Sequence, residues 1–348
     1  MQNKIILTFL SIFLLGVLVF AIAFGAVSIQ PNDMLLALQH YFSGKHSSSI
    51  EESVFLQLRL PRVLLCGITG AILSVSGVLM QGLFRNPIVE PGLIGTSAGA
   101  AFGASFVFVF AAYFGSETQL LVGPLLVPLF AFAGGLTTTF IVYQLSKNAK
   151  QTAVSTILLI GIAMNAIALS GTGFMSYLAR DPQARSISFW NMGTFSGASW
   201  LQFFIVLFVA LIVFFISFKD AKKLNALMLG DEEAYYLGVN TNSFKRKILI
   251  ANTAMVAVAT SFVGVIGFMG LIVPHVMRLV VGSDHKKLLP ASMISGAILL
   301  ILADIGARLF LAPSEIPIGI ITSIVGAPVY ILLLKTNKFI LIKGGLND

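Results

Sequence analysis

The sequence predicts an all-α polytopic membrane protein with about ten transmembrane helices, arranged as a single transmembrane domain over residues 1–348. Of these residues, 57% are hydrophobic and only 10% are charged, and the mean hydropathy is +0.94. A soluble domain carries about 25% charged residues, so water alone could not solvate the surface of this chain. Apolar runs of about 20 residues recur along the sequence, and each is long enough to cross ~30 Å of hydrocarbon as a helix.

The apolar runs predict the spans in chain order. The first run, 5–28, is longer than the apolar region of a secretory signal peptide, so we interpret it as a retained span although Ala21-Ile22-Ala23 resembles a cleavage site. A short surface helix, PNDMLLALQHYF, is expected in the segment 31–58. The other spans are expected at 62–82, 93–114, 120–145, 153–175, 201–218, 247–266, 268–282, 290–310 and 317–335.

The spans also suggest internal symmetry and close packing. Segments 62–175 and 247–335 hold four spans each, which is compatible with an inverted repeat of the kind found in many transporters. Gly95, Gly99 and Gly103 lie four residues apart on one helix face, where small residues let membrane helices approach closely. The glycines of 264–270 recur every third residue near a helix break, and a tight bend and a hinge are equally open interpretations.

The distribution of basic residues predicts the orientation in the membrane. An even number of spans puts both termini on one side, and 16 of the 22 Lys and Arg residues fall on that side. The six on the other side are Lys45, Arg59, Arg62, Arg180, Arg185 and Arg308. Because Lys and Arg accumulate in cytoplasmic loops, we expect cytoplasmic N- and C-termini. This bias accounts for the net charge of +8, so we expect a lipid bilayer and no nucleic acid as partner.

Catalytic and metal-binding patterns are missing from the chain. Its one cysteine, Cys66, stands among apolar neighbours as a small packing residue. No HExxH motif and no plausible triad occurs, so we predict no catalytic residue, no metal site and no enzyme activity. His275 is interpreted as structural, and Asn165, near a span centre, as a hydrogen-bond donor to a neighbouring helix. Asp304 and Arg308 lie one helical turn apart.

The densest charge lies in the segment 219–246, between the sixth and seventh spans on the predicted cytoplasmic side. Two short helices are expected there, AKKLNALML and a second one that opens with Asp231, Glu232 and Glu233, where acids suit the positive end of the helix dipole. Gly238 fits the end of that helix.

Within that second helix, Ala234 and Leu237 are expected to form a small apolar face beside two tyrosines. Two rigid helices at the membrane surface could insert into a groove of a partner protein. The alternative is a solvated loop lying on lipid, which acids next to anionic headgroups disfavour. The chain has no GxxxxGK[ST] phosphate loop, so we expect no cofactor in this chain and ATP-Mg in a partner ATPase.

Four stretches carry a family resemblance: RLPRVLLCGITGAILSVSGVLMQGLFRNPIVEPGLIGTSAGA, LGDEEAYYLGVN, GFMGLIVPHVMRLVVGSDHKKLLP and ADIGARLFLAPSEIPIGIITSIVGAPVYILLLK. Over nearly its whole length the chain resembles the FecCD-like permease subunits of type II ABC importers for iron-siderophores, haem and cobalamin. The resemblance implies their permease fold, a homodimer, one ABC ATPase subunit beneath each permease, and a soluble substrate-binding protein on the outer face. It also implies a bacterial cytoplasmic (inner) membrane location.

The resemblance assigns roles to particular residues. Contact with the ATPase is implied for Gly230, Asp231, Glu232, Glu233, Ala234, Leu237 and Gly238. Docking of the binding protein is implied for Arg59, Arg62 and Arg308, since arginine pairs with carboxylates through two parallel hydrogen bonds. The alternatives are that Arg59 and Arg62 anchor a span to headgroups, or that Arg308 pairs only with Asp304.

The pathway is implied to run along the dimer axis, past Met164, Asn165 and Leu169. The stretch ARDPQARSISFWNMGTFSGASW most resembles haem permeases. Its Arg180 and Arg185 would attract haem propionates at the entrance, or would only stabilise the loop.

The function expected from these observations is ATP-driven import of an iron chelate, haem or a ferric siderophore, by alternating access. A cobalamin importer of the same family is the first alternative. A secondary carrier or exporter that works without an ATPase is the alternative from another class, and an intramembrane enzyme ranks third.

Overall fold

The computed structural model of the chain describes residues 2–24, 31–43, 49–113, 116–147 and 154–335, and all regular structure in these ranges is helical. The long helices are α1 (Gln2–Ala23), α4 (Leu60–Phe84), α5 (Thr96–Phe110), α6 (Ser116–Lys147), α7 (Val154–Leu178), α9 (Trp200–Lys219), α12 (Thr241–Val263), α13 (Met269–Val281), α14 (His285–Leu309) and α15 (Ile318–Lys335). The short helices are α2 (Pro31–Phe42), α3 (Ile50–Ser53), the π-helix Val54–Arg59, the 3-10 helices Pro91–Ile94 and Ala111–Tyr113, α8 (Asp181–Asn191), α10 (Ala221–Leu229) and α11 (Asp231–Tyr236).

The ten long helices match the ten predicted spans in order. Seven helical stretches in the described ranges are long and apolar enough to cross a membrane, while α5, α13 and α15 are shorter apolar helices. The end of the first predicted span, 25–28, lies outside the described residues. α2, α10 and α11 coincide with the three short helices that the sequence predicts. The inverted relation between α4–α7 and α12–α15 stays a prediction.

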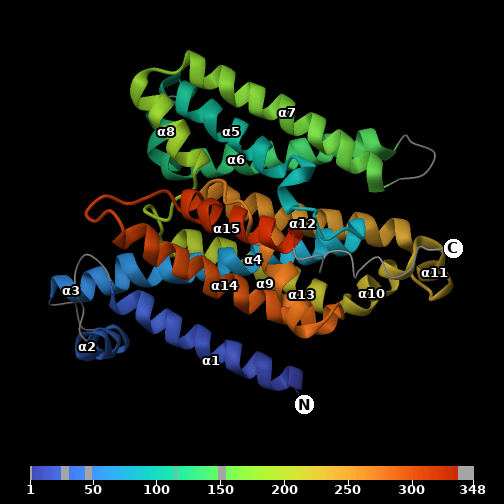
Figure 1. Cartoon of the computed structure of the whole chain (residues 1–348). Coiled ribbons are helices and arrows are strands. Elements are labelled where there is room, and N and C mark those ends of the chain that lie inside the picture. Colours follow the sequence, from blue (N-terminus) through green and yellow to red (C-terminus); the bar gives the residue numbers. More distant parts are fainter. Residues whose placement is uncertain (1, 25–30, 44–48, 114–115, 148–153, 336–348) are drawn as a thin grey trace.

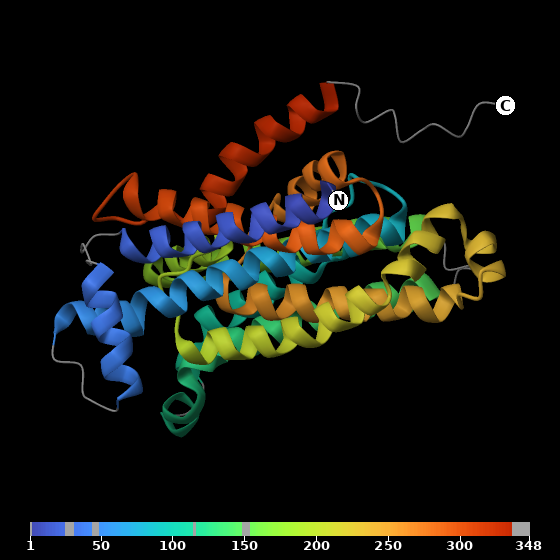
Figure 2. The same ribbon diagram turned by 90° about the horizontal axis from the view of Figure 1, so that it is seen from below.

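α4 occupies the centre of the helical array, and α1 lies on its outside (Figures 1 and 2). α9, α12, α13 and α14 pack around α4. In an apolar window of 18 residues, 89% of the stretch that contains α4 is buried, against 11% for α1. α5, α6 and α7 form a further layer beyond α12 (Figure 1). A movement of α4 would therefore displace the helices that pack around it.

Small residues set the closest helix contacts. A Cβ atom on Gly70 of α4 would lie 2.2 Å from the carbonyl oxygen of Gly296 in α14, closer than any real Cβ contact. On α5, a Cβ on Gly99 would lie 2.2 Å from Thr138 Oγ1 and one on Gly103 would lie 2.1 Å from the Phe130 oxygen, both in α6. The predicted packing role of the α5 glycines is therefore confirmed.

The connections gather at two ends of the bundle. The start of α1 and the pair α10–α11 lie at one end, and α2, α3, α8 and the α14–α15 connection lie at the other (Figure 1). This grouping agrees with the predicted division of the connections into two sides. The break after α12 is a tight bend, since Gly264 and Phe268 both have left-handed backbone with φ of +77° and +67°. Its use as a hinge stays a prediction.

Candidate functional site

Gly230 separates α10 from α11 and fixes the angle between them. Its φ of +147° is one that side-chain-bearing residues rarely adopt. A Cβ at this position would also lie 1.8 Å from Oε2 of Glu233, which folds back over the turn. Only glycine therefore fits both the backbone and the neighbouring carboxylate.

Asp231 pairs with side chains of the helical bundle, although 43% of its own side chain is exposed. Its Oδ1 accepts a hydrogen bond from Arg85 Nη2 at 2.8 Å, and its Oδ2 accepts one from Lys245 Nζ at 2.6 Å. Arg85 directly follows the central helix α4, and Lys245 is a buried residue of α12. The first residue of α11 is thus tied to two membrane-spanning helices at once.

Asp220 anchors the start of α10 in the same manner. Its carboxylate forms ion pairs with Lys223 at 2.9 Å and with Lys247 of α12. Burial alone would raise the pKa of Asp220, but the hydrogen bonds from Lys247 and Lys223 outweigh it and lower that pKa. Both short helices are therefore held on α12 by charged side chains.

The outer surface of this segment is apolar and aromatic. We call Leu229, Tyr235, Tyr236 and Leu237 the coupling patch; Tyr236 is 85% exposed and Leu237 is 63% exposed. The prediction that Ala234 and Leu237 share one face is wrong, because Ala234 is buried. Leu237 lies beyond α11 as its C-cap, so the helical spacing no longer relates the two residues.

Glu232, Glu233 and Gly238 are exposed around the coupling patch. Of the predicted coupling residues, Gly230 and Ala234 are buried and Asp231 is partly exposed, whereas the others are exposed. Their contact with an ATPase stays a prediction.

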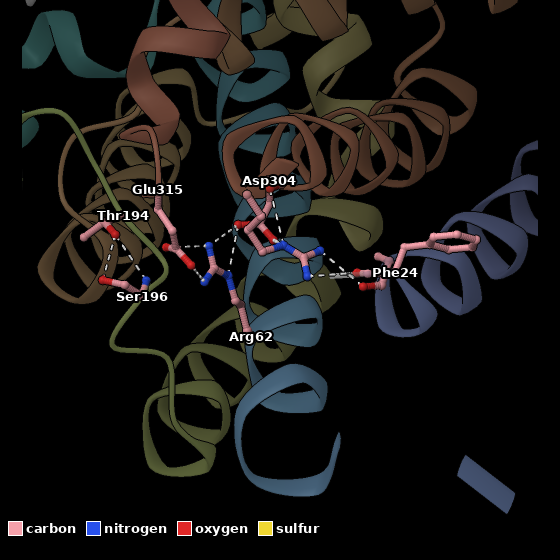
Figure 3. A network of polar contacts seen from close by, with 8 residues as sticks. Phe24, Arg62, Thr194, Ser196, Asp304 and Glu315 are labelled. Carbon is pink, nitrogen blue, oxygen red and sulfur yellow. Dashed lines mark hydrogen bonds and ion pairs between the residues drawn. The ribbon is translucent and has the colours of Figure 1, made fainter. Parts of the chain in front are cut away.

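An arginine–carboxylate cluster lies at the opposite end of the bundle (Figure 3). Arg62 Nε and Nη2 donate to Asp304 Oδ1 at 3.1 and 2.9 Å. Its Nη1 and Nη2 also donate to Glu315 Oε1 and Oε2 at 2.7 and 3.1 Å. Arg308 Nε lies 3.0 Å from Asp304 Oδ2, as the spacing of one helical turn predicts. Glu315 was not expected from the sequence to take part.

Two arginines of this end also hold the end of α1. Arg59 Nη1 donates to the carbonyl oxygens of Ile22 and Ala23 at 2.9 and 3.0 Å. Arg308 donates to those of Phe24 and Ala21 at 3.3 and 3.2 Å (Figure 3). The last carbonyls of a helix lack partners within it, so these arginines complete α1. Arg308 therefore has partners besides Asp304, and docking at these arginines stays a prediction.

The predicted pathway residues of α7 differ in their surroundings. Asn165 Nδ2 donates to the carbonyl oxygens of Gly92 and Leu93 at 3.3 and 3.1 Å, which confirms the expected hydrogen bond to a neighbouring segment. Met164 is half-buried, whereas Leu169 is 58% exposed. Their place in a pathway stays a prediction.

α8 is a helix that the sequence analysis did not identify. Arg180 precedes it and Arg185 lies on it, and both are exposed. The signal was present in the sequence, because Asp181 and Pro182 suit the first helical positions and Gln183 Oε1 accepts a hydrogen bond from the Arg180 amide at 3.0 Å.

Glu90 has a structural role that was not predicted from the sequence. Its Oε1 accepts a hydrogen bond from the Phe268 amide at 2.9 Å, so the α4–α5 connection is joined to the start of α13. Burial raises the pKa of Glu90, and the hydrogen bond opposes that rise. Among the described residues no three His, Cys, Asp or Glu side chains converge as a metal site would require.

Comparison with known proteins identifies the family. The model of the FecCD transport family matches residues 12–336, nearly the whole chain. The chain belongs to the FecCD transport family. This FecCD chain is 39% identical over 285 residues to the hemin transport system permease protein HmuU of Yersinia pestis, covering 82% of this chain and 84% of that protein. It is 37% identical over 339 residues to the vitamin B12 import system permease protein BtuC of Escherichia coli, covering 97% of each.

A solved structure agrees with the family. A metal-chelate type ABC transporter in an inward-facing conformation matches this FecCD chain with a TM-score of 0.82 and 29% identity, covering 96% of this chain and 99% of that one. The chain is therefore an ABC importer permease with the predicted all-α polytopic membrane fold. It is a transport subunit of its family and not a catalytic one.

Proposed function

We propose that two copies of this FecCD chain, with two ABC ATPase subunits and a soluble substrate-binding protein, import an iron chelate across a bacterial cytoplasmic membrane. The observation that carries the proposal is the coupling patch, an exposed apolar surface on two short helices that ion pairs hold rigidly to the bundle. ATP-Mg is hydrolysed in the partner subunit, since this chain has no phosphate-loop motif.

The geometry provides a route by which ATPase closure moves the spans. The coupling patch inserts into a groove of the ATPase, with Glu232 and Glu233 at its rim. Displacement of α10 and α11 passes through Asp220 and Asp231 to α12, and through Asp231 and Arg85 to α4. Alternating access then follows from a two-state bundle whose balance the ATPase and the docked binding protein shift.

The role of the coupling patch can be tested by replacing one exposed tyrosine inside the patch and, as a control, one exposed tyrosine outside it. Tyr236→Ala should weaken association with the ATPase about tenfold, because tyrosines in the centre of interfaces often dominate binding. The matched control is Tyr113→Ala, which removes a tyrosine that is 84% exposed in the helix after α5. Unchanged ATPase binding and ATP-driven uptake in the double variant Tyr236→Ala, Leu237→Asp would contradict the proposal.

Docking of the binding protein is proposed for the opposite end, with Arg62 as its main contact. Arg59 and Arg308 cap α1, whereas Arg62 reaches a carboxylate near the surface. Arg62→Gln is therefore a cleaner variant than any change of Arg59. It should weaken binding-protein affinity, and the loss should shrink at high salt because salt screens the attraction between the two approaching protein surfaces.

The second copy is proposed to cover the exposed face of α7. Large apolar side chains project from this helix, and such a face suits another apolar surface. They include Leu159, Ile162, Ile167, Leu169 and Phe174, each more than half exposed. A pathway between two copies would then pass Met164, Asn165 and Leu169.

Haem or a ferric siderophore is the proposed substrate, with cobalamin as the alternative that BtuC raises. The exposed Arg180 and Arg185 at α8 support haem, because two guanidinium groups suit two propionates. α8 lies at the end of the bundle that also holds α3 and the connection between α14 and α15 (Figure 1).

The substrate assignment can be tested by removing the charges of the two arginines and, separately, those of the haem propionates. In proteoliposomes with ATPase and binding protein, uptake of haem, a ferric siderophore and cyanocobalamin is compared first. Arg180→Gln with Arg185→Gln should slow haem uptake severalfold, yet leave uptake of the haem dimethyl ester unchanged, since its propionates carry no charge. Uptake of cyanocobalamin alone would overturn the iron-chelate assignment in favour of the alternative.

A further inference from the structure

Glu315 lies in the connection between α14 and α15, and both of its carboxylate oxygens accept hydrogen bonds from the Arg62 guanidinium. The two hydrogen bonds measure 2.7 and 3.1 Å (Figure 3). The side chain of Glu315 is 38% exposed, that of Arg62 is 13% exposed, and that of Asp304 is 2% exposed. Of the two carboxylates on Arg62, only Glu315 can be reached from outside the bundle.

Arg62 has little capacity left for another carboxylate. A guanidinium has five N–H bonds, and four of those on Arg62 are directed at Asp304 and Glu315. A docking protein that pairs with Arg62 through two hydrogen bonds must therefore displace one of its present partners. Displacing Glu315 exchanges one carboxylate for another, whereas displacing Asp304 would leave a buried charge unpaired.

The other two arginines of this end offer no such exchange. Arg59 and Arg308 donate to backbone carbonyls of α1, which would lose their partners if these arginines turned outward. Of the three arginines, Arg62 is therefore the one that can pair with an acidic partner without breaking hydrogen bonds to α1.

Glu315 also connects this exchange to α15. The amide of the next residue, Ile316, donates to the Ala307 oxygen in α14 at 3.0 Å, and α15 begins two residues further on. The first amides of α15, on Ile318 and Gly319, donate to the Gly193 and Met192 oxygens just after α8 at 3.0 and 2.8 Å. The segment that Glu315 fastens to α4 thus leads directly into the contact between α15 and the end of α8.

We propose that Glu315 is a positioning residue that competes with the binding protein for Arg62. In the free permease it occupies the guanidinium; on docking, a carboxylate of the acidic partner takes its place and the segment 310–317 is released from α4. The inference rests on the proposed function, in which an acidic binding protein docks at this end.

The test compares two single charge removals at the same end of the permease complex. Glu315→Gln should tighten the affinity for the purified substrate-binding protein of this permease by about threefold to tenfold, the range for losing a partly exposed competing ion pair. The control is Glu51→Gln, which removes an exposed carboxylate of α3 that no described arginine contacts, and it should change affinity less than twofold.

A double-mutant cycle separates competition from a general loss of structure. In an Arg62→Gln background, Glu315→Gln should bring no further gain, because the contested group is absent. Glu315→Asp keeps the charge and should restore affinity close to that of the unaltered protein. Elution of each complex at the unaltered position in size-exclusion chromatography checks that all variants are assembled.

The outcomes distinguish the inference from the function on which it rests. If Arg62→Gln weakens docking but Glu315→Gln leaves affinity unchanged or lowers it, competition is wrong and docking stands. If Arg62→Gln has no effect either, docking at this arginine is wrong, and the competition by Glu315 falls with it.

Discussion

Asp231 is the residue on which the position of the coupling segment depends most. Its two carboxylate oxygens are divided between Arg85 at the end of α4 and Lys245 of α12. The side chain of Lys245 is only 6% exposed, so loss of Asp231 would leave a buried ammonium group without its partner. This carboxylate therefore acts inside the subunit, while its neighbours Glu232 and Glu233 remain on the surface.

Asp231→Asn should uncouple the permease while leaving the ATPase bound. We expect ATP-driven uptake about threefold to tenfold lower, because one charged partner of both Arg85 and Lys245 is lost. Asp181→Asn, an exposed carboxylate at the start of α8, is the control for loss of one negative charge. Measurement of uptake and of ATPase co-purification in parallel checks the prediction, and equal uptake by both variants would refute it.

The roles of single residues could be predicted from the sequence only where they are local. Acids at the start of α11 and the pairing of Asp304 with Arg308 follow from spacing along one helix. The pairing of Arg85 with Asp231 joins residues 146 positions apart, and no local pattern indicates it. The capture of Arg62 by Glu315, 253 positions away, was missed for the same reason.

At the scale of elements, short helices with clear ends were predicted best. α2 and α10 have the predicted bounds and α11 begins at the predicted residue, because turn residues and caps mark them in the sequence. Gly230 lies between the two short helices α10 and α11, and its unusual backbone conformation is a finding of the structure. α8 has an Asp-Pro start of equal quality, but no helix was predicted in this segment.

Gly230→Ala should change the angle between α10 and α11 and so displace the coupling patch. The φ of +147° is unfavourable for alanine, and its Cβ would meet the Glu233 carboxylate at 1.8 Å. We expect a loss of ATPase affinity of about tenfold, while the permease itself stays folded because the junction lies between two short helices and outside the membrane-spanning ones. Gly238→Ala is the comparison, since its φ of +81° is also left-handed but no atom lies within 4 Å of its Cβ. A loss as large in Gly238→Ala would show that backbone strain alone, without the Glu233 contact, explains the effect.

At the scale of the whole molecule, the number and order of spans could be predicted but their arrangement could not. α1 and α4 are both apolar runs of suitable length, yet α1 lies outside the bundle and α4 lies at its centre. The difference comes from close contacts such as Gly70 with Gly296, which join distant parts of the chain. The hydropathy of a segment indicates whether it can lie in the bilayer, but it does not indicate which helices the segment contacts.

The two ends of the molecule should face opposite sides of the membrane. On a Cys66→Ser background, Leu229→Cys should react with a membrane-impermeant maleimide only from the cytoplasmic side, and Leu311→Cys only from the outside. Both positions are exposed, at 66% and 62%, so access and not burial decides the labelling. Labelling of Leu229→Cys in intact cells would show that the orientation is the reverse of the predicted one, and the coupling patch could then not contact a cytoplasmic ATPase.

This FecCD chain is expected to transport nothing without a partner ATPase. The most direct measurement is substrate accumulation in proteoliposomes that hold the permease alone, the permease with active ATPase, or the permease with an ATPase that cannot hydrolyse ATP. We predict accumulation only with active ATPase and ATP, in the presence of the binding protein. Accumulation by the permease alone on an ion gradient would contradict the account and establish a secondary carrier.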